Sequence, residues 1–424
     1  MAWEGGCTNI IFVALHKEGM QLIVMLLDMD YFFAQVEERE NPLLAGKPLM
    51  VCIFSGRGEL GGVVSTCNYA ARALGVHSGM PIAFAKKKAP EGAFLKADFE
   101  KYNKASEAVM GIVGAHAKTV EQASIDEAYA DITQECNGDF KKAAKIAQEI
   151  KKEILKQEKL TCSVGIGENK LIAKMAAGEK KPDGLTVVKQ GEAAAFLGPM
   201  PVGKLFGVGK KTEEKLHALG IKTIGELAKK EEGLLKENFG NSFGHYLFEA
   251  SKGVDEEEVR EREEPAQVSK VASFPEDTNN REEIAKMVAT LAQGVHEKLC
   301  EGGLEFRQVT FIGILEGLQT HTKSKTQEKH SQSGELLKSV AQELAAGFGL
   351  GGKKMRRAGV RVGMLQKKQE GVEEEGGKKK GKVAQGEAKK QAQKKKAQGN
   401  ARETKAKTQK GADAAGGQKS LSDF

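Results

Sequence analysis

The sequence predicts an α+β protein, because strand-like and helix-like patterns are mixed along the chain. Continuous apolar runs such as residues 22–27 (LIVMLL) are typical of buried strands. Residues 139–157 instead alternate Lys and Glu around Ile146, Ile150 and Ile154 at helical spacing. The chain has 424 residues, of which 40% are hydrophobic, and domains of ~100–200 residues would make about two to four of them.

In the first half of the chain, apolar runs predict strands, glycine-rich residues predict a turn, and helical spacing predicts helices. In chain order these are strands at 22–27 and 49–54, a turn at 56–62, a helix beginning within 67–75, a helix at 103–116, an acidic strand–turn unit at 119–132, a helix at 139–157, a strand at 161–166, a helix at 169–178 and a strand at 185–188.

The second half begins with residues 201–253, which are helical in pattern. An acidic stretch at 255–264 (DEEEVREREE), ended by Pro265, predicts a linker. Beyond it, strands are predicted at 268–274, 306–315 and 357–364, with helices at 281–300 and 333–347. This order gives a small βαββαβ sheet if residues 306–325 supply two strands.

The positive charge of the chain is concentrated at its end. The whole sequence has 65 Lys and Arg against 58 Asp and Glu, a formal net charge of +7. Residues 366–424 hold 16 basic and 8 acidic residues, whereas residues 1–365 hold 49 basic and 50 acidic ones. The last segment has too few apolar residues to offset its ordering entropy, so we expect disorder. It is either a solvated linker or a weak, salt-sensitive contact for nucleic acid.

The apolar and cysteine patterns exclude several classes of protein. No run of about 18 apolar residues exists, so we expect no membrane-spanning helix. Residues 9–15 (NIIFVAL) are too short, and unsuitably flanked, for a signal peptide. Six cysteines are scattered without a CxxC pair, which argues against a zinc site or a disulfide framework and suits a cytoplasmic location.

Two acidic motifs lie at predicted strand ends. Residues 28–33 (DMDYFF) follow the first strand, and residues 124–127 (SIDE) place Asp126 beside Glu127. Buried or adjacent carboxylates need a positive partner. If the two strands are neighbours, Asp28, Asp126 and Glu127 form one cluster of oxygen donors that suits Mg²⁺. Two such ions about 3.5–4 Å apart would activate a hydroxyl and stabilise a leaving pyrophosphate. The alternative is ordinary surface carboxylates.

Two further segments carry groups that suit a triphosphate. Thr66, Tyr69 and Arg72 recur every three residues, and at a helix start they would share one face. Lys170, with Lys174 one helical turn on, could neutralise phosphate charge. A solvated helix face is the alternative for the first segment, and a commonplace surface lysine is the alternative for Lys170.

Two more motifs suggest contacts with macromolecules. Residues 205–212 (LFGVGKKT) have the form of a helix–hairpin–helix. In this motif Gly207 and Gly209 allow a tight turn that points backbone N–H groups at a phosphate. Lys210 and Lys211 add positive charge. The alternative is a glycine-rich helix–helix turn. At the terminus, Gln418, Leu421 and Phe424 are spaced three apart, as in a single turn that fills a pocket; the alternative is a chance match in a low-complexity tail.

Together these segments resemble the Y-family DNA polymerases, the translesion enzymes, especially their archaeal DNA polymerase IV branch. The resemblance runs from about Leu22 to Leu365, and its strings occur in the family's order and spacing. They are DMDYFFAQVE (28–37), NPLLAGKPLMVCIFSGRG (41–58), TCNYAAR (66–72), SIDEAY (124–129), SVGIGENKLIAKMAA (163–177) and KPDGLTVV (181–188).

The resemblance implies a right-hand architecture with a C-terminal little finger. The implied domains are an unmatched extension at 1–21, a palm at 22–199 with fingers inserted at about 41–98, a thumb with the helix–hairpin–helix at 200–254, a linker at 255–265, a little finger at 266–365 and the tail at 366–424. Because residues 1–21 match nothing in the family, Met20 and Met25 are alternative starts to Met1.

The resemblance also implies a role for each motif. Asp28, Asp126 and Glu127, with the Met29 backbone carbonyl, would hold two Mg²⁺ ions. Phe33 falls at the steric gate, the aromatic ring that excludes the ribose 2′-OH. Triphosphate-binding residues would be Thr66, Tyr69, Arg72 and Lys170. The DNA-binding residues would be Gly207, Gly209, Lys210 and Lys211 of the thumb and Lys323, Lys325, Arg356, Arg357 and Arg361 of the little finger.

The implied activity is low-fidelity, template-directed extension of a primer by deoxynucleoside triphosphates, with release of pyrophosphate. Its partners would be primer–template DNA and, through Gln418, Leu421 and Phe424, a sliding clamp. This peptide ends with one aromatic residue where two are usual, so a weak interaction is expected. We expect a monomer and no membrane partner. Two alternatives are a non-catalytic DNA-binding protein, which the intact acidic triad disfavours, and a nucleotidyl cyclase, which the long DNA-gripping segments disfavour.

Overall fold

The structure, a computed structural model, describes residues 20–58, 60–261 and 265–368. Within these ranges it confirms the α+β class. Most of the N-terminal extension, the terminal peptide and all but the first residues of the Lys-rich tail lie outside the described residues. Among the described residues, no helix is long and apolar enough to cross a membrane.

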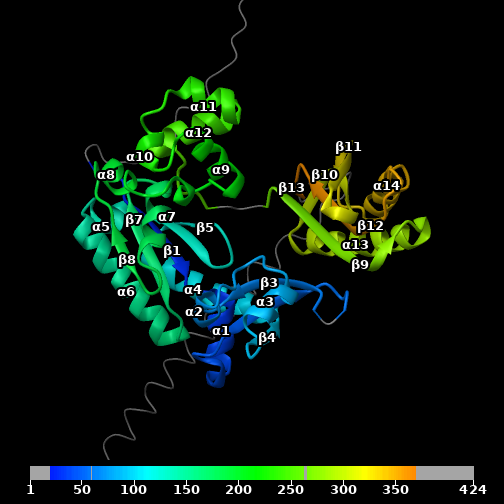
Figure 1. Cartoon of the computed structure of the whole chain (residues 1–424), viewed down its shortest axis with the longest axis horizontal. Coiled ribbons are helices and arrows are strands. Elements are labelled where there is room, and N and C mark those ends of the chain that lie inside the picture. The colour runs from blue at the N-terminus through cyan, green and yellow to red at the C-terminus, as the bar shows by residue number, and fades with distance from the viewer. Residues whose placement is uncertain (1–19, 59, 262–264, 369–424) are drawn as a thin grey trace, which may run out of the picture. The chain divides into compact units, whose positions relative to one another are not determined.

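A five-stranded sheet, here called the central sheet, carries the acidic motifs. It consists of β1 (Val24–Met29), β5 (Thr119–Gln122), β6 (Glu127–Asp131), β7 (Cys162–Gly167) and β8 (Leu185–Val187) in the order β5-β6-β1-β7-β8 (Figure 1). Strand β1 pairs antiparallel with both β6 and β7, and β7 and β8 are parallel. The most apolar strand therefore lies in the middle, where both of its edges are covered.

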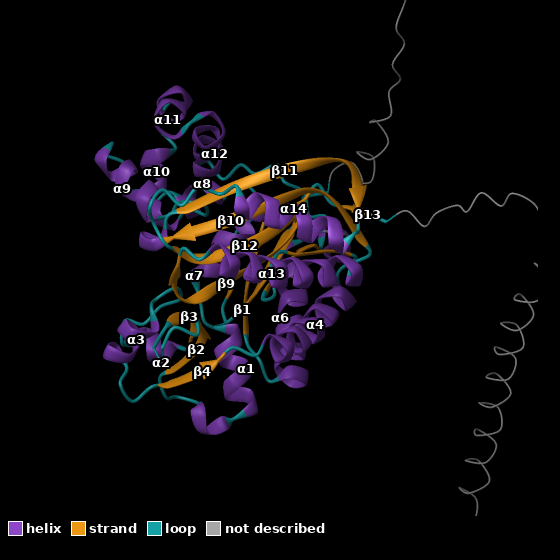
Figure 2. Cartoon of the chain, turned by 90° about the vertical axis from the view of Figure 1, so that its right-hand side faces the viewer, coloured by secondary structure: helices purple, strands orange, loops and turns teal. Residues whose placement is uncertain are grey.

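Helices cover both faces of the central sheet (Figure 2). Met25 and Leu27 of β1 pack in one core with α4 (Phe99–His116) and α6 (Phe140–Glu158). The alternate residues Val24 and Leu26 pack with α7 (Lys170–Glu179) on the other face, as the two-residue period of a strand requires. A Cβ at Gly165 of β7 would overlap the α7 backbone, so glycine at this position lets α7 approach the sheet.

Between α1 (Phe32–Glu40) and α4 lies a smaller unit, here called the inserted sheet. It contains η1 (Pro42–Leu44), β2 (Leu49–Phe54), β3 (Gly62–Cys67), α2 (Tyr69–Ala73), α3 (Ile82–Lys88) and β4 (Ala93–Lys96), with the strand order β3-β2-β4. Its own small core includes Met50, Val64 and Ile82.

Short helices follow the central sheet. The remaining helix of the first part is α5 (Thr133–Cys136), and the helical region beyond it consists of α8 (Ala193–Leu197), η2 (Val202–Lys204), α9 (Lys210–Ala218), α10 (Ile224–Leu227), α11 (Glu232–Phe239) and α12 (Asn241–Ser251). Leu216, Ile224 and Leu247 are buried in its core together with Leu171 and Ile172 of α7.

A second sheet, here called the C-terminal sheet, has the predicted βαββαβ order. Its elements are β9 (Gln267–Thr278), α13 (Arg281–Glu301), β10 (Leu304–Leu315), η3 (Glu316–Leu318), β11 (Thr320–Ser331), α14 (Gly334–Ala346), β12 (Met355–Gly363) and β13 (Gln366–Lys367). The strand order is β11-β10-β12-β9, and α13 and α14 pack on one face around Phe306 and Phe311 (Figure 2).

Three sequence expectations need correction. Strand β1 runs from Val24 to Met29 rather than over 22–27, so Asp28 lies inside it. Strand β3, helix α3 and strand β4 were not predicted; they are short and gain their stability from pairing with β2 and from tertiary packing. The last segment does not lose structure at residue 366, because Gln366 and Lys367 pair with β10 as β13.

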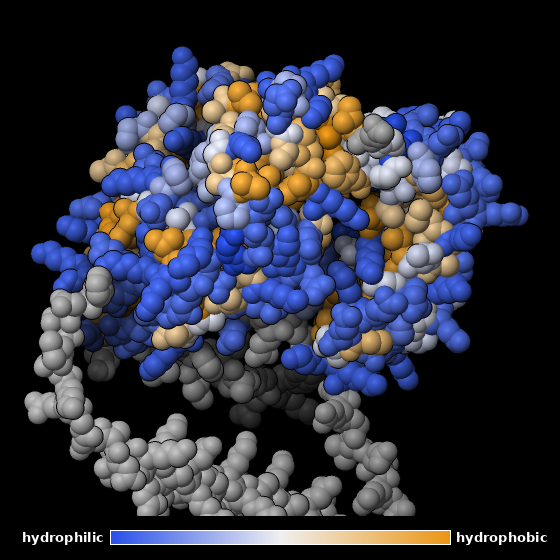
Figure 3. All heavy atoms as spheres, turned by 90° about the horizontal axis from the view of Figure 1, so that it is seen from below, coloured by the Kyte–Doolittle hydropathy of each residue, from blue (hydrophilic) through white to orange (hydrophobic). Residues whose placement is uncertain are grey.

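The surface seen in Figure 3 is mostly hydrophilic, with apolar side chains gathered in a few patches. Large exposed apolar residues include Leu43, Phe84 and Leu318. Scattered residues of this kind are normal for a folded protein.

Candidate active site

One pocket of about 290 Å³ gathers nearly all of the residues predicted to act on a nucleotide. The central sheet contributes Asp28, Met29, Asp126 and Glu127, helix α1 contributes Phe33, and the inserted sheet contributes Thr66, Tyr69 and Arg72. The pocket is also lined by Ser65 and by four residues for which the sequence predicts no role in the site, Tyr31, Phe32, Ser78 and Lys181.

The carboxylates meet because their strands are neighbours. Asp28 of β1 lies directly across from Glu127 of β6, and the Met29 backbone N–H donates to the Asp126 carbonyl at 2.9 Å. The Ser124 hydroxyl donates to Asp126 Oδ1 at 2.5 Å and fixes that side chain in the turn before β6. The conditional prediction that the two acidic strands are adjacent is therefore confirmed.

Two lysines face these carboxylates. The Lys181 ammonium contacts Asp28 Oδ1, and the Lys174 ammonium contacts Glu127 Oε1 and lies 3.7 Å from Asp28 Oδ2. Burial raises the pKa of Asp28 above its ordinary value, Lys181 opposes that shift, and Glu127 adds to it. The cluster is thus a concentration of negative charge that requires cations around it.

The donor set fits a hard divalent cation, since it consists of carboxylate and carbonyl oxygens only. As they stand among the described residues, no three His, Cys, Asp or Glu side chains are arranged around one cation position. The reason is visible in the ion pairs: Asp28 and Glu127 are oriented toward Lys181 and Lys174. A bound divalent cation would take the place of these ammonium groups.

The neighbouring Asp30 has a different role from Asp28. It is fully buried, and it accepts hydrogen bonds from the Ser163 hydroxyl at 2.7 Å, the Thr161 hydroxyl at 2.9 Å and the Asp183 backbone N–H at 2.8 Å. These bonds tie the end of β1 to β7 and to the loop before β8. Asp30 therefore holds the backbone that presents Asp28.

The inserted sheet presents groups suited to an anion. The Tyr69 hydroxyl is buried, and no hydrogen bond to it is found within the described residues. The Arg72 guanidinium lies 5.1 Å from the Tyr69 ring centroid and donates through Nε to the Cys67 carbonyl at 3.1 Å, and the residue is exposed. A polar group without a partner in a pocket favours a polar ligand.

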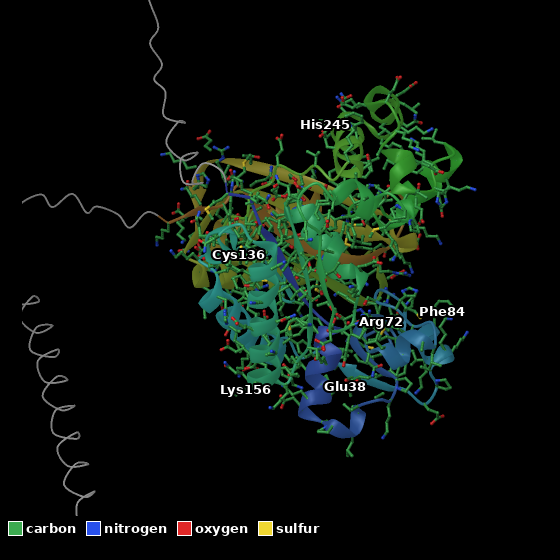
Figure 4. All side chains as sticks on the ribbon, turned by 90° about the vertical axis from the view of Figure 1, so that its left-hand side faces the viewer. Glu38, Arg72, Phe84, Cys136, Lys156 and His245 are labelled. Carbon is green, nitrogen blue, oxygen red and sulfur yellow. The ribbon has the colours of Figure 1, made fainter. Side chains whose placement is uncertain are left out.

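Glu38 links helix α1 to this anion-binding segment. Its carboxylate accepts hydrogen bonds from the Tyr31 hydroxyl at 3.2 Å and from Asn68 Nδ2 at 2.7 Å. Asn68 is the N-cap of α2, the helix that carries Arg72 (Figure 4). The Tyr31 ring in turn meets the Tyr69 ring edge-on at 5.1 Å.

The structure does not place Lys170 in the pocket. Its side chain is only 6% exposed and its ammonium pairs with Glu121 at 2.9 Å and Glu257 at 3.0 Å, outside the pocket. Lys181 lines the pocket instead. No sequence pattern distinguishes the two lysines, because Lys181 lies in a loop with no periodicity.

The hairpin motif has the expected local geometry. Gly207 has a φ of +83°, and a Cβ there would lie 3.1 Å from the Tyr246 ring, whose hydroxyl donates to the Phe206 carbonyl at 2.5 Å. Gly209 is the N-cap of α9, and Lys210 and Lys211 are exposed in its first turn. Backbone N–H groups and two ammonium groups therefore share one helix start.

The five basic residues predicted on the C-terminal sheet do not lie on one face. Lys323 donates to the Gly347 carbonyl and Lys325 pairs with Glu343, so both lie on the side of α14. Arg356 makes a two-point contact with Asp277. Arg357 and Arg361 alternate with the buried core residues Ala358, Val360 and Val362, and so face the side without helices. The alternation of basic and buried apolar residues along β12 is the sequence signal that could have separated these residues from Lys323 and Lys325. Gln418, Leu421 and Phe424 lie outside the described residues.

Family models match three stretches of the chain. The impB/mucB/samB family matches residues 27–178, its C-terminal domain matches residues 265–375, and a thumb domain described for DNA polymerase-iota matches residues 203–255. The matches coincide with the central and inserted sheets, the C-terminal sheet and the helical region.

Curated relatives are similar over almost their whole length. A DNA polymerase IV of Methanosarcina acetivorans is 45% identical over 357 residues, covering 82% of this chain and 98% of the relative. One of Nitrosopumilus maritimus is 38% identical over 351 residues, covering 82% and 96%. Among solved structures, the chain is similar to a Y-family polymerase chimera, Dbh-Dpo4(243-245)-Dbh, with a TM-score of 0.77 and 32% identity, covering 82% of this chain and 100% of the chimera. It is also similar to an insertion ternary complex of Dbh DNA polymerase, with a TM-score of 0.62 and 32% identity, covering 82% of this chain and 100% of that one.

Proposed function

The chain belongs to the impB/mucB/samB family, the Y-family DNA polymerases, and we propose that it extends primers across damaged template positions. It is a DNA-directed DNA polymerase. The observation that carries the proposal is the single pocket in which the acidic residues of the central sheet face the anion-binding residues of the inserted sheet.

We propose that Asp28, Asp126 and Glu127, with the Met29 carbonyl, hold two Mg²⁺ ions. The oxygen-only donor set and its excess of negative charge support this choice. Bound Mg²⁺ supplies activation of the primer 3′-hydroxyl and neutralises charge on the triphosphate. Asp30 keeps the strand end that carries Asp28 in place through its three hydrogen bonds.

The triphosphate would lie against Tyr69, Arg72 and Lys181. The Tyr69 hydroxyl is a hydrogen-bond donor with no partner in the part of the chain that the structure describes, and the exposed Arg72 suits bidentate contact with phosphate oxygens. Lys181 would exchange Asp28 for the triphosphate. These groups stabilise the charge that develops during phosphoryl transfer.

Phe33 would select the sugar. Phe33 lines the same pocket as Asp28, and there its ring would collide with a ribose 2′-hydroxyl or strip its solvation. The expected partners are therefore deoxynucleoside triphosphates and primer–template DNA; the relatives include complexes titled ternary and insertion ternary.

Tolerance of damaged templates would follow from small side chains. Ser65, Thr66 and Ser78 line the pocket on the inserted sheet, and they restrict the shape of a nascent base pair weakly. Gly61 and Gly62 of the same unit line a neighbouring pocket of about 310 Å³. We further propose a cytoplasmic location, in keeping with the free cysteines of the described residues, and weak attachment to a sliding clamp through Gln418, Leu421 and Phe424.

The decisive experiment compares two carboxylate variants on a primed template that carries a lesion. Asp126→Asn should abolish Mg²⁺-dependent insertion opposite the lesion while binding of the same DNA, measured by fluorescence anisotropy, is retained. Asp139→Asn is the matched control, because Asp139 is an exposed N-cap of α6 and asparagine caps equally well. Undiminished insertion by Asp126→Asn would refute the metal assignment. If the parent chain inserts nucleotides opposite undamaged bases only, the translesion role is refuted.

A further inference from the structure

The ring of Phe33 is supported from behind by a second aromatic residue. Tyr102 of α4 stacks on it with ring centroids 4.3 Å apart and an angle of 12° between the planes. Phe99, at the start of α4, meets the Phe33 ring edge-on at 5.9 Å. Tyr102 is fully buried, whereas Phe33 is half-buried and borders the pocket. One face of the Phe33 ring is therefore covered by protein.

Tyr102 is itself fixed at its far end. Its hydroxyl donates to Glu37 Oε1 at 2.6 Å, and the Glu37 carboxylate also accepts from Lys101 Nζ at 2.9 and 3.0 Å. Burial, together with the hydrogen bond to Glu37, raises the pKa of Tyr102, so its hydroxyl stays a proton donor at neutral pH. The tyrosine can neither tilt nor slide without breaking a buried, charge-assisted hydrogen bond.

Both contacts of Tyr102 lie on the same face of α1. Phe33 and Glu37 are four residues apart, which places them one above the other on a helix. Tyr102 thus spans one turn of α1, with its ring over Phe33 and its hydroxyl on Glu37. This geometry sets the height and the plane of the Phe33 ring relative to the backbone that carries it.

We propose that Tyr102, anchored by Glu37 and assisted by Phe99, is a positioning residue that holds Phe33 against the sugar and so sets discrimination between deoxyribonucleotides and ribonucleotides. The inference rests on the proposed role of Phe33 as the gate. It assigns sugar selection to a buried pair of residues that a nucleotide never touches.

The physical reason is that a steric gate excludes by position. A phenyl ring whose rear face is packed against protein cannot move away from a 2′-hydroxyl. If the space behind the ring is loosely packed, the ring can rotate away and the clash is relieved. A stacked aromatic pair contributes up to about tenfold in an equilibrium. Loss of the stack should therefore lower the discrimination ratio by about this factor while the ring of Phe33 remains present.

The alternative is that Tyr102 is an ordinary core residue that contributes only to the stability of the fold. In that case its replacement lowers stability, and it slows incorporation of both kinds of nucleotide equally. The two readings differ in the ratio of kcat/KM for a deoxynucleotide to that for the matching ribonucleotide. Tyr102→Phe, which keeps the ring and removes only the hydroxyl, separates the contribution of the stack from that of the hydrogen bond to Glu37.

The experiment measures this ratio by single-nucleotide insertion on a primed template, for the parent chain and the variants. Tyr102→Met keeps an apolar side chain but no flat ring, and should lower the ratio about tenfold. Tyr102→Phe should restore most of it, because the stack is kept. Val109→Ala, two turns further along α4 in the same core, is the control for a general loss of packing and should leave the ratio unchanged.

The outcomes separate the inference from the function on which it rests. If Phe33→Ala relaxes sugar selection and Tyr102→Met does not, the gate stands and the positioning role is refuted. If Phe33→Ala leaves selection unchanged, the gate assignment itself fails. On the Phe33→Ala background, Tyr102→Met should have no additional effect on the ratio; a further tenfold loss would show that Tyr102 acts by another route.

A second variant keeps the test decisive if Tyr102→Met does not fold. Phe99 is 49% exposed, so Phe99→Ala is expected to fold, and it removes the edge-on support of Phe33. It should lower the discrimination ratio about two- to threefold, the lower range for an aromatic pair. With Tyr102→Met unfolded, an unchanged ratio in Phe99→Ala would overturn the proposal.

Discussion

Replacement of Lys181 by methionine tests the geometry of the pocket most directly. Lys181 lines the pocket and its ammonium contacts Asp28, whereas Lys170 pairs with Glu121 outside the pocket. If contact with the triphosphate requires a place in the pocket, Lys181→Met should impair nucleotide use. Lys170→Met should instead lower the stability of the fold.

The sizes of the two effects follow from the surroundings of each ammonium group. The Lys181 side chain is 25% exposed, and a charged hydrogen bond to phosphate is worth about 1.5–3 kcal/mol, or ~10- to 150-fold in kcat/KM. The side chains of Lys170 and Glu121 are only 6% and 2% exposed. Removal of one partner from such a buried pair costs about 3–5 kcal/mol of unfolding free energy.

The assay is single-nucleotide insertion on a primed template, with urea unfolding followed by circular dichroism for each variant. Lys180→Met is the matched control, because Lys180 is adjacent, equally charged and exposed. It should change kcat/KM less than about twofold, in the range of surface substitutions. A large loss of kcat/KM in Lys170→Met at unchanged stability, with Lys181→Met active, would refute the reasoning.

Three further predictions concern other parts of the chain. Deletion of residues 418–424 should reduce clamp-stimulated synthesis and leave unaided synthesis intact; an equal loss of both would contradict attachment to the clamp through this peptide. Arg356 holds the pKa of Asp277 below its ordinary 3.8, so this pair stabilises the fold above that pH and the contribution is lost as the pH falls through the lowered pKa. Asp277→Asn should therefore flatten the decline of Tm between about pH 5 and pH 2, and an unaltered slope would count against the pair. Phe311→Ala, at a fully buried ring 5.2 Å from Phe348, should cost about 3–5 kcal/mol in urea unfolding; a loss below ~1 kcal/mol would contradict this core.

The acidic centre of the site was predictable because its signal is local. An apolar run that ends in Asp28 and a second motif at Asp126 and Glu127 both show in the sequence, and only their adjacency had to be supplied by the structure. The family resemblance supplied the roles of Phe33, Tyr69 and Arg72, and the pocket brings these residues together. Chemistry that depends on one strand end or one helix start can be predicted in this way.

The rest depends on contacts between distant segments. The choice of Lys181 over Lys170 is decided by burial, since α7 turns Lys170 toward Glu121 of β5. The support of Phe33 by Tyr102 joins residues 69 positions apart, with no periodic pattern that connects them. The separation of Lys323 and Arg361 follows from strand register, which a one-residue shift would invert.

The position of β1 in the middle of the central sheet implies an uneven distribution of local stability around the pocket. Backbone amides of β1 are bonded on both sides, so hydrogen exchange there should require near-global opening. Tyr69 and Arg72 belong instead to a five-residue helix beside a three-stranded sheet, where exchange through smaller openings should be faster. The wall of the pocket that carries Asp28 should thus open far less often than the wall that carries Tyr69 and Arg72.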